Sequence, residues 1–381
     1  MMEKEVVGMK QVCFVTEANG SIGMGHVTRC AAMAAAFTEN NCQALLMTGA
    51  CENDTLSQSI GKIWPGLHQT YPLEKAYGQA GWNQQRHHEP LPKLVAMLEV
   101  MEGKPSDRLV ILDRYDLSED WVVKLQTVAG KVGYVDDYHH QIHQADFVIN
   151  HQVGAEKENR PGGFYGELPV PIKLLGSHYA LLRSEFRAVP PRKIRPVVRH
   201  ILIMTGGGNQ FGWQEKLLAW SQEIRPQLES ISQKTITLHL LTGATGLLFK
   251  QWQDETQHLN DVIVYPRLEN LTPVMNYMDL AVTAGGGTLY ELAAWGVPAL
   301  SLMMAENQRH FVNVLEENGV TRSLGWHETL DRKTYQQRLM ESVRDTDWRQ
   351  TCSRHMQQLV DGKGPDRIVE ALLESRGVEV S

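Results

Sequence analysis

A regular alternation of short apolar segments with longer helix-forming segments constrains the fold more than any other feature of the sequence. Residues 11–16 are apolar and rich in β-formers, a glycine-containing loop follows, and residues 26–39 are rich in alanine. The same order returns further on, with strands predicted at 44–47, 109–112, 131–135 and 147–149 and helices at 91–101 and 119–128. Because helices separate the strands, the pattern predicts a parallel sheet with right-handed crossovers.

A proline-rich stretch at 188–198, AVPPRKIRPVV, interrupts this pattern and is interpreted as an interdomain linker. The alternation then restarts, with strands predicted at 200–204, 235–241, 262–265, 280–283 and 299–302 and helices at 214–224, 271–277, 289–295, 335–343, 348–360 and 366–374. We therefore expect an α/β protein of two doubly wound, Rossmann-like domains, 9–190 and 198–360, facing each other across a cleft that binds the ligand. A C-terminal helix at 364–376 is expected to pack back on the first domain.

Composition and charge narrow the class of protein. The chain has 44 acidic and 37 basic residues and a formal net charge of −7, which disfavours a nucleic-acid protein with a broad basic face. No apolar stretch approaches the roughly 20 residues of a transmembrane helix. The five cysteines are scattered without C-x-x-C spacing, so neither a disulfide framework nor a zinc site is indicated. We expect a soluble, cytoplasmic protein.

The first candidate for chemistry is the loop at 17–29, EANGSIGMGHVTR, between a predicted strand and a predicted helix. Its glycines would let the backbone approach a ligand, and free amides at the helix start favour an anion. His26 lies at this helix start, where the helix dipole disfavours imidazolium and would keep the ring able to accept a proton. The alternative is a glycine-rich turn with a capping histidine. The G-x-G-x-x-G dinucleotide fingerprint is missing, and no cofactor is expected.

Two further glycine loops come after strands in the second half. TGGGNQFG at 205–212 suits a diphosphate or a sugar lying against bare backbone, and the lack of Lys-Ser/Thr after the glycines excludes a P-loop. In TAGGGTLYE at 283–291, Thr288 can bond a phosphate oxygen and Glu291 can accept from ribose hydroxyls. Each loop alone could be a turn. Because both lie at the carboxyl ends of strands of one domain, they predict a nucleotide-diphosphate pocket.

Two other polar features have more than one interpretation. Asp113 ends a predicted strand and could either touch a substrate or cap the next element. The segment DDYHHQIH at 136–143 is rich in potential ligands but lacks a recognised metal-ligand spacing, so no metal site is predicted.

Taken together, the motifs resemble the UDP-sugar hydrolases of pseudaminic acid biosynthesis and their spore-coat polysaccharide relatives. The matching stretches occur in the family's order over most of the chain: IGMGHVTRCAAMA (22–34), LDRYDLSEDW (112–121), YVDDYHHQIHQADFVIN (134–150), LLGSHYALLRSEF (174–186), ILIMTGGGN (201–209), DLAVTAGGGTLYELAAWGVPAL (279–300), AENQ (305–308) and VDGKGPDRI (360–368). GxGHxxRC with LLGxxYALLRxEF is a specific combination, whereas the GGGT loop is shared with many GT-B glycosyltransferases.

The resemblance implies a GT-B architecture related to the transferase that adds N-acetylglucosamine in peptidoglycan synthesis. Its C-terminal half would bind UDP, and its N-terminal half would bind the sugar. Family members of the hydrolase type remove UDP from a diacetamido-trideoxy-altropyranose by adding water, without a metal, and the histidine of their GxGH motif, here His26, is the proposed base. The implied UDP-binding residues are Gly207, Gly208, Asn209, Gly286, Gly287, Thr288 and Glu291. The implied substrate-side residues are Gly23, Gly25, Arg29, Asp113, Tyr115, Asn307 and Gln308.

Two departures from the family keep alternatives open. Where the family's first loop carries an Arg-x-Asp-x-Ser string, this chain has Val15, Glu17 and Asn19. The chain is also longer, partly at 53–90, a segment that could carry an acceptor or partner surface. The first alternative is therefore a glycosyltransferase that uses the same pocket and an acceptor hydroxyl. The second is a non-catalytic accessory protein that binds nucleotide sugars in polysaccharide synthesis.

Overall fold

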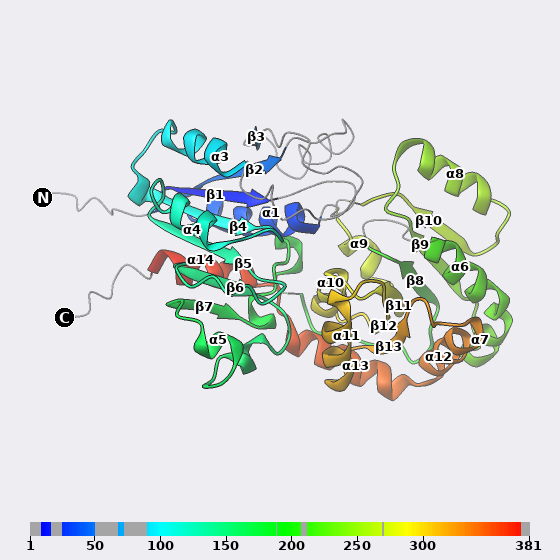
Figure 1. Cartoon of the computed structure of the whole chain (residues 1–381). Helices are drawn as coiled ribbons and strands as arrows, with labels where there is room; N and C mark the ends of the chain where they lie inside the picture. Colours follow the sequence, from blue (N-terminus) through cyan, green and yellow to red (C-terminus); the bar gives the residue numbers. More distant parts are fainter. Residues whose placement is uncertain are drawn as a thin grey trace, which may run out of the picture. The chain divides into compact units, whose positions relative to one another are not determined.

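Two compact α/β units make up the chain. The computed structural model describes residues 9–16, 25–49, 68–71, 90–187, 189–206, 212–268 and 270–374. The first unit runs to Ser184, the second extends from Glu185 to Gly362, and the chain belongs to the first unit again from Lys363 onward. Each unit is built on one sheet flanked by helices (Figure 1).

The first unit contains a seven-stranded sheet in which every neighbouring pair is parallel. Its strands, in spatial order, are β3 (His68–Tyr71), β2 (Gln43–Gly49), β1 (Gln11–Thr16), β4 (Arg108–Asp113), β5 (Lys131–Val135), β6 (Phe147–Asn150) and β7 (Ile172–Leu175). The strand order changes direction between β1 and β4. In doubly wound sheets a ligand binds at such a switch point, outside the carboxyl ends of the strands.

The central strands of this sheet are buried on both faces. Along β1, Val12 and Phe14 enter one core cluster, while Cys13 and Val15 enter another. Successive strand residues point to opposite faces, so a strand covered on both sides must be apolar throughout. This explains why β1 reads as a continuous apolar run and not as an alternating one.

Helices cover both faces of the sheet (Figure 1). One face carries α1 (Gly25–Glu39) and α14 (Gly364–Glu374), and the other carries α3 (Pro90–Glu99) and α4 (Glu119–Leu125). Shorter elements are α5 (Phe164–Glu167), η2 (Pro105–Asp107), η3 (Ala155–Glu158) and η4 (Ser177–Tyr179). The C-terminal helix α14 packs on α1 through the buried side chains of Ile368, Val369 and Leu372.

The second unit repeats the same winding with a six-stranded parallel sheet. In spatial order its strands are β10 (Val262–Tyr265), β9 (Thr237–Leu241), β8 (His200–Met204), β11 (Leu280–Ala284), β12 (Ala299–Met303) and β13 (Arg322–Trp326). Its helices are α6 (Trp213–Glu223), α7 (Arg225–Ser232), α8 (Gly246–Thr256), α9 (Thr272–Met275), α10 (Thr288–Trp295), α11 (Asn307–Glu317), α12 (Arg332–Arg344) and α13 (Thr346–Leu359). The switch point lies between β8 and β11.

The proline-rich stretch that the sequence assigns to a linker belongs to the second unit. Arg195 Nε lies 2.8 Å from Asp279 Oδ1, and Arg349 Nη2 donates to the Pro196 carbonyl oxygen at 2.8 Å. Arg192 donates to backbone carbonyl oxygens of Met278 and Trp295. These contacts attach the stretch to the helices and strands that come after it, so the second unit begins before the position that the sequence predicts.

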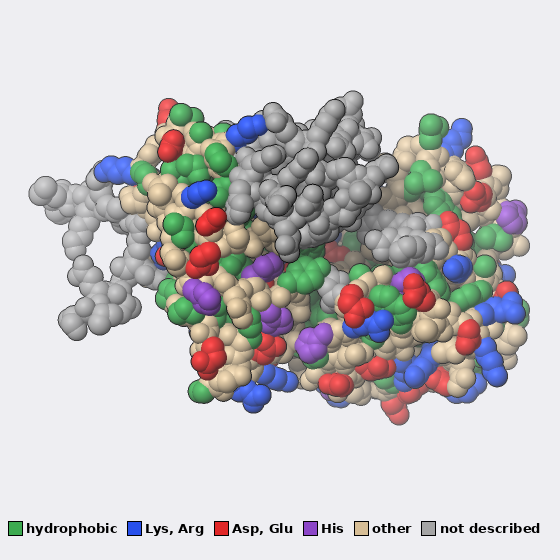
Figure 2. Space-filling view, in the orientation of Figure 1, with side chains coloured by type: hydrophobic (Ala, Val, Ile, Leu, Met, Phe, Trp, Pro, Cys, Tyr) green, Lys and Arg blue, Asp and Glu red, His purple; other side chains and the backbone are tan. Residues whose placement is uncertain are grey.

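On the face shown in Figure 2, the acidic and basic side chains of the described residues are interspersed. Among the described helices, none is both long enough and apolar enough to cross a membrane.

Candidate functional site

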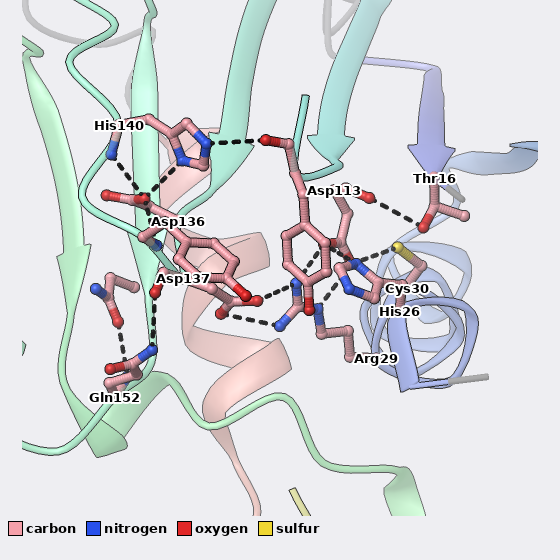
Figure 3. Close-up of polar contacts among 12 residues, drawn as sticks. Thr16, His26, Arg29, Cys30, Asp113, Asp136, Asp137, His140 and Gln152 are labelled. Carbon is pink, nitrogen blue, oxygen red and sulfur yellow. Dashed lines mark hydrogen bonds and ion pairs between the residues drawn. The ribbon is translucent and has the colours of Figure 1, made fainter. Parts of the chain in front are cut away.

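Helix α1 presents three polar side chains of the first unit on one face. His26 is its second residue, and Arg29 and Cys30 lie three and four residues further on, which places all three side chains side by side. Figure 3 shows them reaching from the helix toward Asp113. The helix begins directly after the glycine-rich loop, and Gly25 at its start has open space where a Cβ would be.

Asp113 is the last residue of β4 and meets all three of these side chains. Its Oδ1 lies 2.7 Å from His26 Nδ1, and its Oδ2 accepts from Arg29 Nε at 2.7 Å. Cys30 Sγ donates to Oδ2 at 3.4 Å, and Arg29 Nη2 also donates to Oδ1. The carboxylate is fully buried, so its polar partners are these protein groups.

The ionisation of Asp113 fixes the tautomer of His26. Burial alone would raise the pKa of this carboxyl, but the Arg29 guanidinium and His26 beside it hold the pKa well below its usual range. An ionised carboxylate can only accept hydrogen bonds. Arg29 Nη2 also lies 3.3 Å from His26 Nδ1, but the Asp113 contact at 2.7 Å is shorter. We therefore place the proton on Nδ1, which leaves Nε2 as a proton acceptor.

Arg29 joins Asp113 to a second carboxylate, Asp137, which lies just after β5. Its Nη1 donates to Asp137 Oδ1 at 3.1 Å, and its Nη2 donates to Asp137 Oδ2 at 2.8 Å. Burial would lower the pKa of Arg29, but the two carboxylates raise it, and the pKa of Asp137 is lowered by Arg29 against the effect of burial. All three guanidinium nitrogens thus bond to the two aspartates.

Tyr115 and Tyr138 place aromatic surface beside His26. The Tyr115 ring is edge-on to the His26 ring, with centroids 4.6 Å apart, and edge-on to Tyr138 at 5.0 Å. Burial, followed by the charge of Asp137, raises the pKa of Tyr115, so its phenol stays protonated. Tyr138 is 51% exposed, which leaves part of this surface open to a ligand.

Several residues of this site are missing from the set that the sequence predicts. Asp136, Asp137, Tyr138 and His140 all come from the segment that the sequence presents only as a possible metal cluster. His151, after β6, lies near Arg29, and burial and that charge lower its pKa to about 4. The signal that could have found Asp137 is its place just after a buried strand, like that of Asp113 at the end of β4.

No metal site stands out in the part of the chain that the structure describes. Within it there is no group of three or more His, Cys, Asp or Glu side chains that could hold an ion. Asp113 and Asp137 bind Arg29. Asp136 bonds to His140 Nδ1, to Tyr165 Oη and to backbone amides.

In the second unit the candidate residues lie around the loop between β11 and α10, and its three glycines differ. A Cβ on Gly285 would overlap Cγ2 of Val312, so this glycine serves packing against α11. Among the described residues, a Cβ on Gly286 would meet only Gln308 Nε2, 3.9 Å away, and one on Gly287 would meet nothing within 4 Å. No described residue therefore packs against this side of the Gly286 and Gly287 backbone.

The start of α10 offers donors to an anion. Thr288 is its first residue, and Glu291 lies in its first turn. The amides of Leu289 and Tyr290 already donate to the Gly286 and Gly287 carbonyl oxygens, at 2.9 and 3.0 Å. The positive end of the helix dipole and the amides before Leu289 are what would attract an anion. Gln308 on α11 lies beside this loop, with its Nε2 3.9 Å from the place of a Cβ on Gly286. Its Oε1 accepts from the Met304 amide, after β12, at 2.8 Å.

The predicted site residues thus fall into two groups. Gly25, His26, Arg29, Asp113 and Tyr115 come together at the β1/β4 switch point, and Gly286, Gly287, Thr288, Glu291 and Gln308 come together beside β11. Gly23, Gly207, Gly208 and Asn209 lie outside the described residues, and so does the side chain of Asn307.

Comparison with known sequences finds distant relatives. No protein-family model matches the chain. It is 25% identical over 214 residues to the uncharacterized protein MJ1062 of Methanocaldococcus jannaschii, a match that covers 53% of this chain and 41% of that protein. It is 22% identical over 258 residues to the spore coat polysaccharide biosynthesis protein SpsG of Bacillus subtilis, covering 66% of this chain and 71% of SpsG. The chain thus spans about two fifths of the length of the first relative and 71% of the length of the second.

Comparison with solved structures covers nearly the whole chain. MurG of Acinetobacter baumannii matches with a TM-score of 0.63 at 14% identity, over 96% of this chain and 99% of that one. The chain has a GT-B-like fold. UDP-GlcNAc 2-epimerase of Neisseria meningitidis, bound to UDP-GlcNAc, matches with a TM-score of 0.61 at 12% identity, over 96% and 100%. UGT89C1 of Arabidopsis thaliana, complexed with UDP-L-rhamnose, gives 0.62 at 12% identity, over 97% and 100%.

Proposed function

We propose that this protein is an enzyme that removes UDP from a UDP-linked deoxy amino sugar, with His26 as the general base. The observation that carries the proposal is the bond between His26 Nδ1 and the buried, ionised Asp113, which leaves Nε2 to accept a proton. The match to SpsG and the UDP-sugars bound to proteins of the same fold support the choice of a nucleotide sugar.

The charges around His26 can balance a positive charge that forms on its ring during the reaction. One guanidinium, Arg29, faces two carboxylates, Asp113 and Asp137, so this group carries a net negative charge while His26 is neutral. A proton on Nε2 makes an imidazolium whose Nδ1–H already contacts a carboxylate. The charge that develops on the base is thus balanced in place, without reorganisation of the site.

In the proposed hydrolysis, Nε2 of His26 takes a proton from a water molecule while the water oxygen bonds to the anomeric carbon. The bond between this carbon and the β-phosphate oxygen breaks, and its electron pair leaves with UDP. Arg29 and Asp113 act by holding His26, because their polar atoms are engaged with each other. Tyr115 and Tyr138 supply the aromatic surface for the sugar.

The second unit binds the leaving group in this proposal. The open backbone of Gly286 and Gly287 and the hydroxyl of Thr288 receive the diphosphate at the start of α10, and Glu291 accepts from the ribose hydroxyls. Gly207, Gly208 and Asn209 would add donors from the loop after β8. Asn307 and Gln308 are assigned to the sugar side, with Gln308 also holding the Met304 amide.

The direct test is UDP release from UDP-2,4-diacetamido-2,4,6-trideoxy-β-L-altrose by the purified protein with no acceptor present. We expect steady release by the wild type and loss of release in His26→Ala, with UDP binding retained. Asp116→Asn is a matched control, because Asp116 pairs with Arg114 at 2.7 Å in the same unit and belongs to a different ion pair from that of His26. Release that persists in His26→Ala would contradict the mechanism.

A glycosyltransferase is the second candidate, and the fold shared with CalG4, the calicheamicin glycosyltransferase, supports it. The same Nε2 would deprotonate a sugar hydroxyl, and the anomeric carbon would bond to that oxygen in place of water. UDP release that requires an added acceptor would select this reaction. UDP binding without turnover on any donor or acceptor would indicate a nucleotide-sugar-binding accessory protein.

A further inference from the structure

His140, on the turn after β5, lies between two hydrogen-bond acceptors. Its Nδ1 lies 3.0 Å from Asp136 Oδ1, and its Nε2 lies 3.3 Å from the carbonyl oxygen of Tyr115 (Figure 3). A carbonyl oxygen can only accept, and a neutral imidazole has one N–H. Both contacts can be hydrogen bonds only if both ring nitrogens carry protons.

The surroundings of Asp136 also indicate that both ring nitrogens of His140 carry protons. This carboxylate is fully buried and accepts from Tyr165 Oη at 2.7 Å and from the Tyr138 and His140 amides at 3.2 and 3.0 Å. Burial would raise the pKa of Asp136, but these hydrogen bonds, led by that of His140, lower it. A buried ionised carboxylate is costly without a counter-charge, and His140 is the ion-pair partner of Asp136 in the described structure.

Tyr115 connects His140 to the site of chemistry. The Tyr115 carbonyl faces His140, and the Tyr115 ring lies edge-on to His26. We propose that His140 is held as an imidazolium between Asp136 and the Tyr115 carbonyl, and that this charge positions Tyr115 against His26. His140 is therefore a positioning residue; its importance for turnover rests on the function proposed above.

The groups that face His140 set its pH dependence. They are Asp136 and Asp137 on its own turn, the Tyr115 carbonyl, and the rings of Tyr134 and Tyr138, with centroids 6.4 and 6.3 Å from its own. Burial lowers the pKa of His140, but the two aspartates and the Tyr115 carbonyl raise it above 6.5 overall. The charge of His140 therefore stabilises the folded state fully below pH 6.5. This stabilisation is lost as the pH rises through the higher folded-state pKa of His140.

The proposal is tested on the substrate-free protein by following histidine ring nitrogens with long-range ¹H–¹⁵N correlation NMR across a pH series. The His140 signals are assigned by their loss in His140→Gln, or in His140→Asn if the first variant does not fold. We expect both nitrogens to be protonated at pH 6.5 and a titration midpoint above this value. A neutral ring at pH 6.5 would overturn the proposal.

The link to His26 is read from the His26 ring resonances at one fixed pH, assigned with His26→Ala. Loss of the His140 charge should shift them, because the Tyr115 ring lies against the His26 ring. His143→Gln is the matched control, since His143 is an exposed histidine three residues further on. Unchanged His26 resonances in His140→Gln would overturn the positioning role. Neither readout needs turnover, so failure of the proposed enzymatic function would be seen separately.

Discussion

The two candidate sites lie at equivalent places in their units, beside the switch-point strands. One consists of charged side chains and the other mainly of backbone. In the first unit, side chains from α1, β4 and the turn after β5 form a closed ionic group around His26. In the second, the groups beside β11 are the bare backbone of Gly286 and Gly287 and the hydroxyl of Thr288. The first arrangement suits proton transfer, and the second suits the binding of a diphosphate against open backbone. Under the proposed function, the same doubly wound fold would hold a reacting site in one unit and a binding site in the other, depending on the residues at the ends of its switch-point strands.

The largest effect is expected from His26→Ala, which removes the proposed proton acceptor. We expect turnover to fall by about 10²–10⁴-fold, the usual contribution of a positioned base. UDP release measures this loss. Calorimetric UDP titration should show an affinity within about twofold of wild type, because the residues proposed to bind UDP lie in the second unit. Equal losses of affinity and turnover would remove the distinction between the two sites.

Asp113→Asn breaks the ionic group but keeps its shape. The amide cannot balance Arg29, so we expect a loss of about 3–5 kcal/mol in the free energy of unfolding together with reduced turnover. Urea unfolding measures the first effect, with Asp116→Asn as the control for loss of a buried ion pair outside the His26 group. The pKa of Asp113 is lowered from 3.8 in the folded state. The Asp113 carboxylate therefore stabilises the fold above pH 3.8, and this stabilisation is lost as the pH falls further. A variant as stable as wild type at pH 7 would contradict this role.

Two neighbouring glycines separate packing from binding in the second unit. Gly285→Ala should destabilise the fold by about 1–3 kcal/mol, because the added methyl group overlaps Val312. Gly287→Ala should leave stability unchanged and weaken UDP binding by about tenfold, ~1.4 kcal/mol, because its methyl group extends into open space. Thermal unfolding measures the stability of both variants, and calorimetry measures their UDP affinity. A stability loss in Gly287→Ala would contradict the prediction, because it would show that the space beside Gly287 is filled in the folded protein.

The smallest expected effect concerns the connection between β1 and β4. Thr16 Oγ1 donates to the Asp113 carbonyl oxygen at 3.1 Å, and both residues are buried. Thr16→Val should cost about 1 kcal/mol in the free energy of unfolding, the usual net value of one hydrogen bond. Turnover should change less than in Asp113→Asn, since the His26 contact remains. Loss of turnover as large as in that variant would mean that the strand end, and not the carboxylate, orients His26.

Much of the fold could be predicted because buried parallel strands are continuous apolar runs. The strands at 131–135, 200–204 and 262–265 have the predicted bounds, and the doubly wound class is confirmed. The helix predicted at 119–128 instead ends at Leu125. Downstream of it, Gly130 packs so closely on the Ser106 backbone that a Cβ there would lie 2.7 Å from the Ser106 carbonyl oxygen, a tertiary contact that local propensity does not encode.

Elements with weak local signals are missing from the sequence-based prediction. β7 has only four residues, and α8 has an irregular apolar pattern in which Leu247 and Leu248 are exposed. β13 includes Gly325 in a left-handed conformation, which weakens its strand signal. Their places depend on neighbouring elements and not on periodicity.

The sequence also indicates His26 and the glycine loop as candidate site residues. It does not show which neighbouring side chains contact them. The resemblance implies that Arg29 and Asp113 are substrate-side residues, and this stays a prediction. The structure adds that their polar atoms bond to each other, to His26 and to Asp137. Asp137 is far from Arg29 in the chain, and only the parallel winding brings the end of β5 beside α1. Likewise, Val312 distinguishes Gly285 from the two glycines after it, although the three are identical in sequence.

The division between a reacting unit and a binding unit is tested most directly by measuring UDP release and UDP affinity together in wild type, His26→Ala and Gly287→Ala. We expect His26→Ala to lose UDP release and to keep UDP affinity. We expect Gly287→Ala to lose affinity but to regain most of its release rate at saturating UDP-sugar. Wild-type release by His26→Ala, or full UDP affinity in Gly287→Ala, would contradict this division.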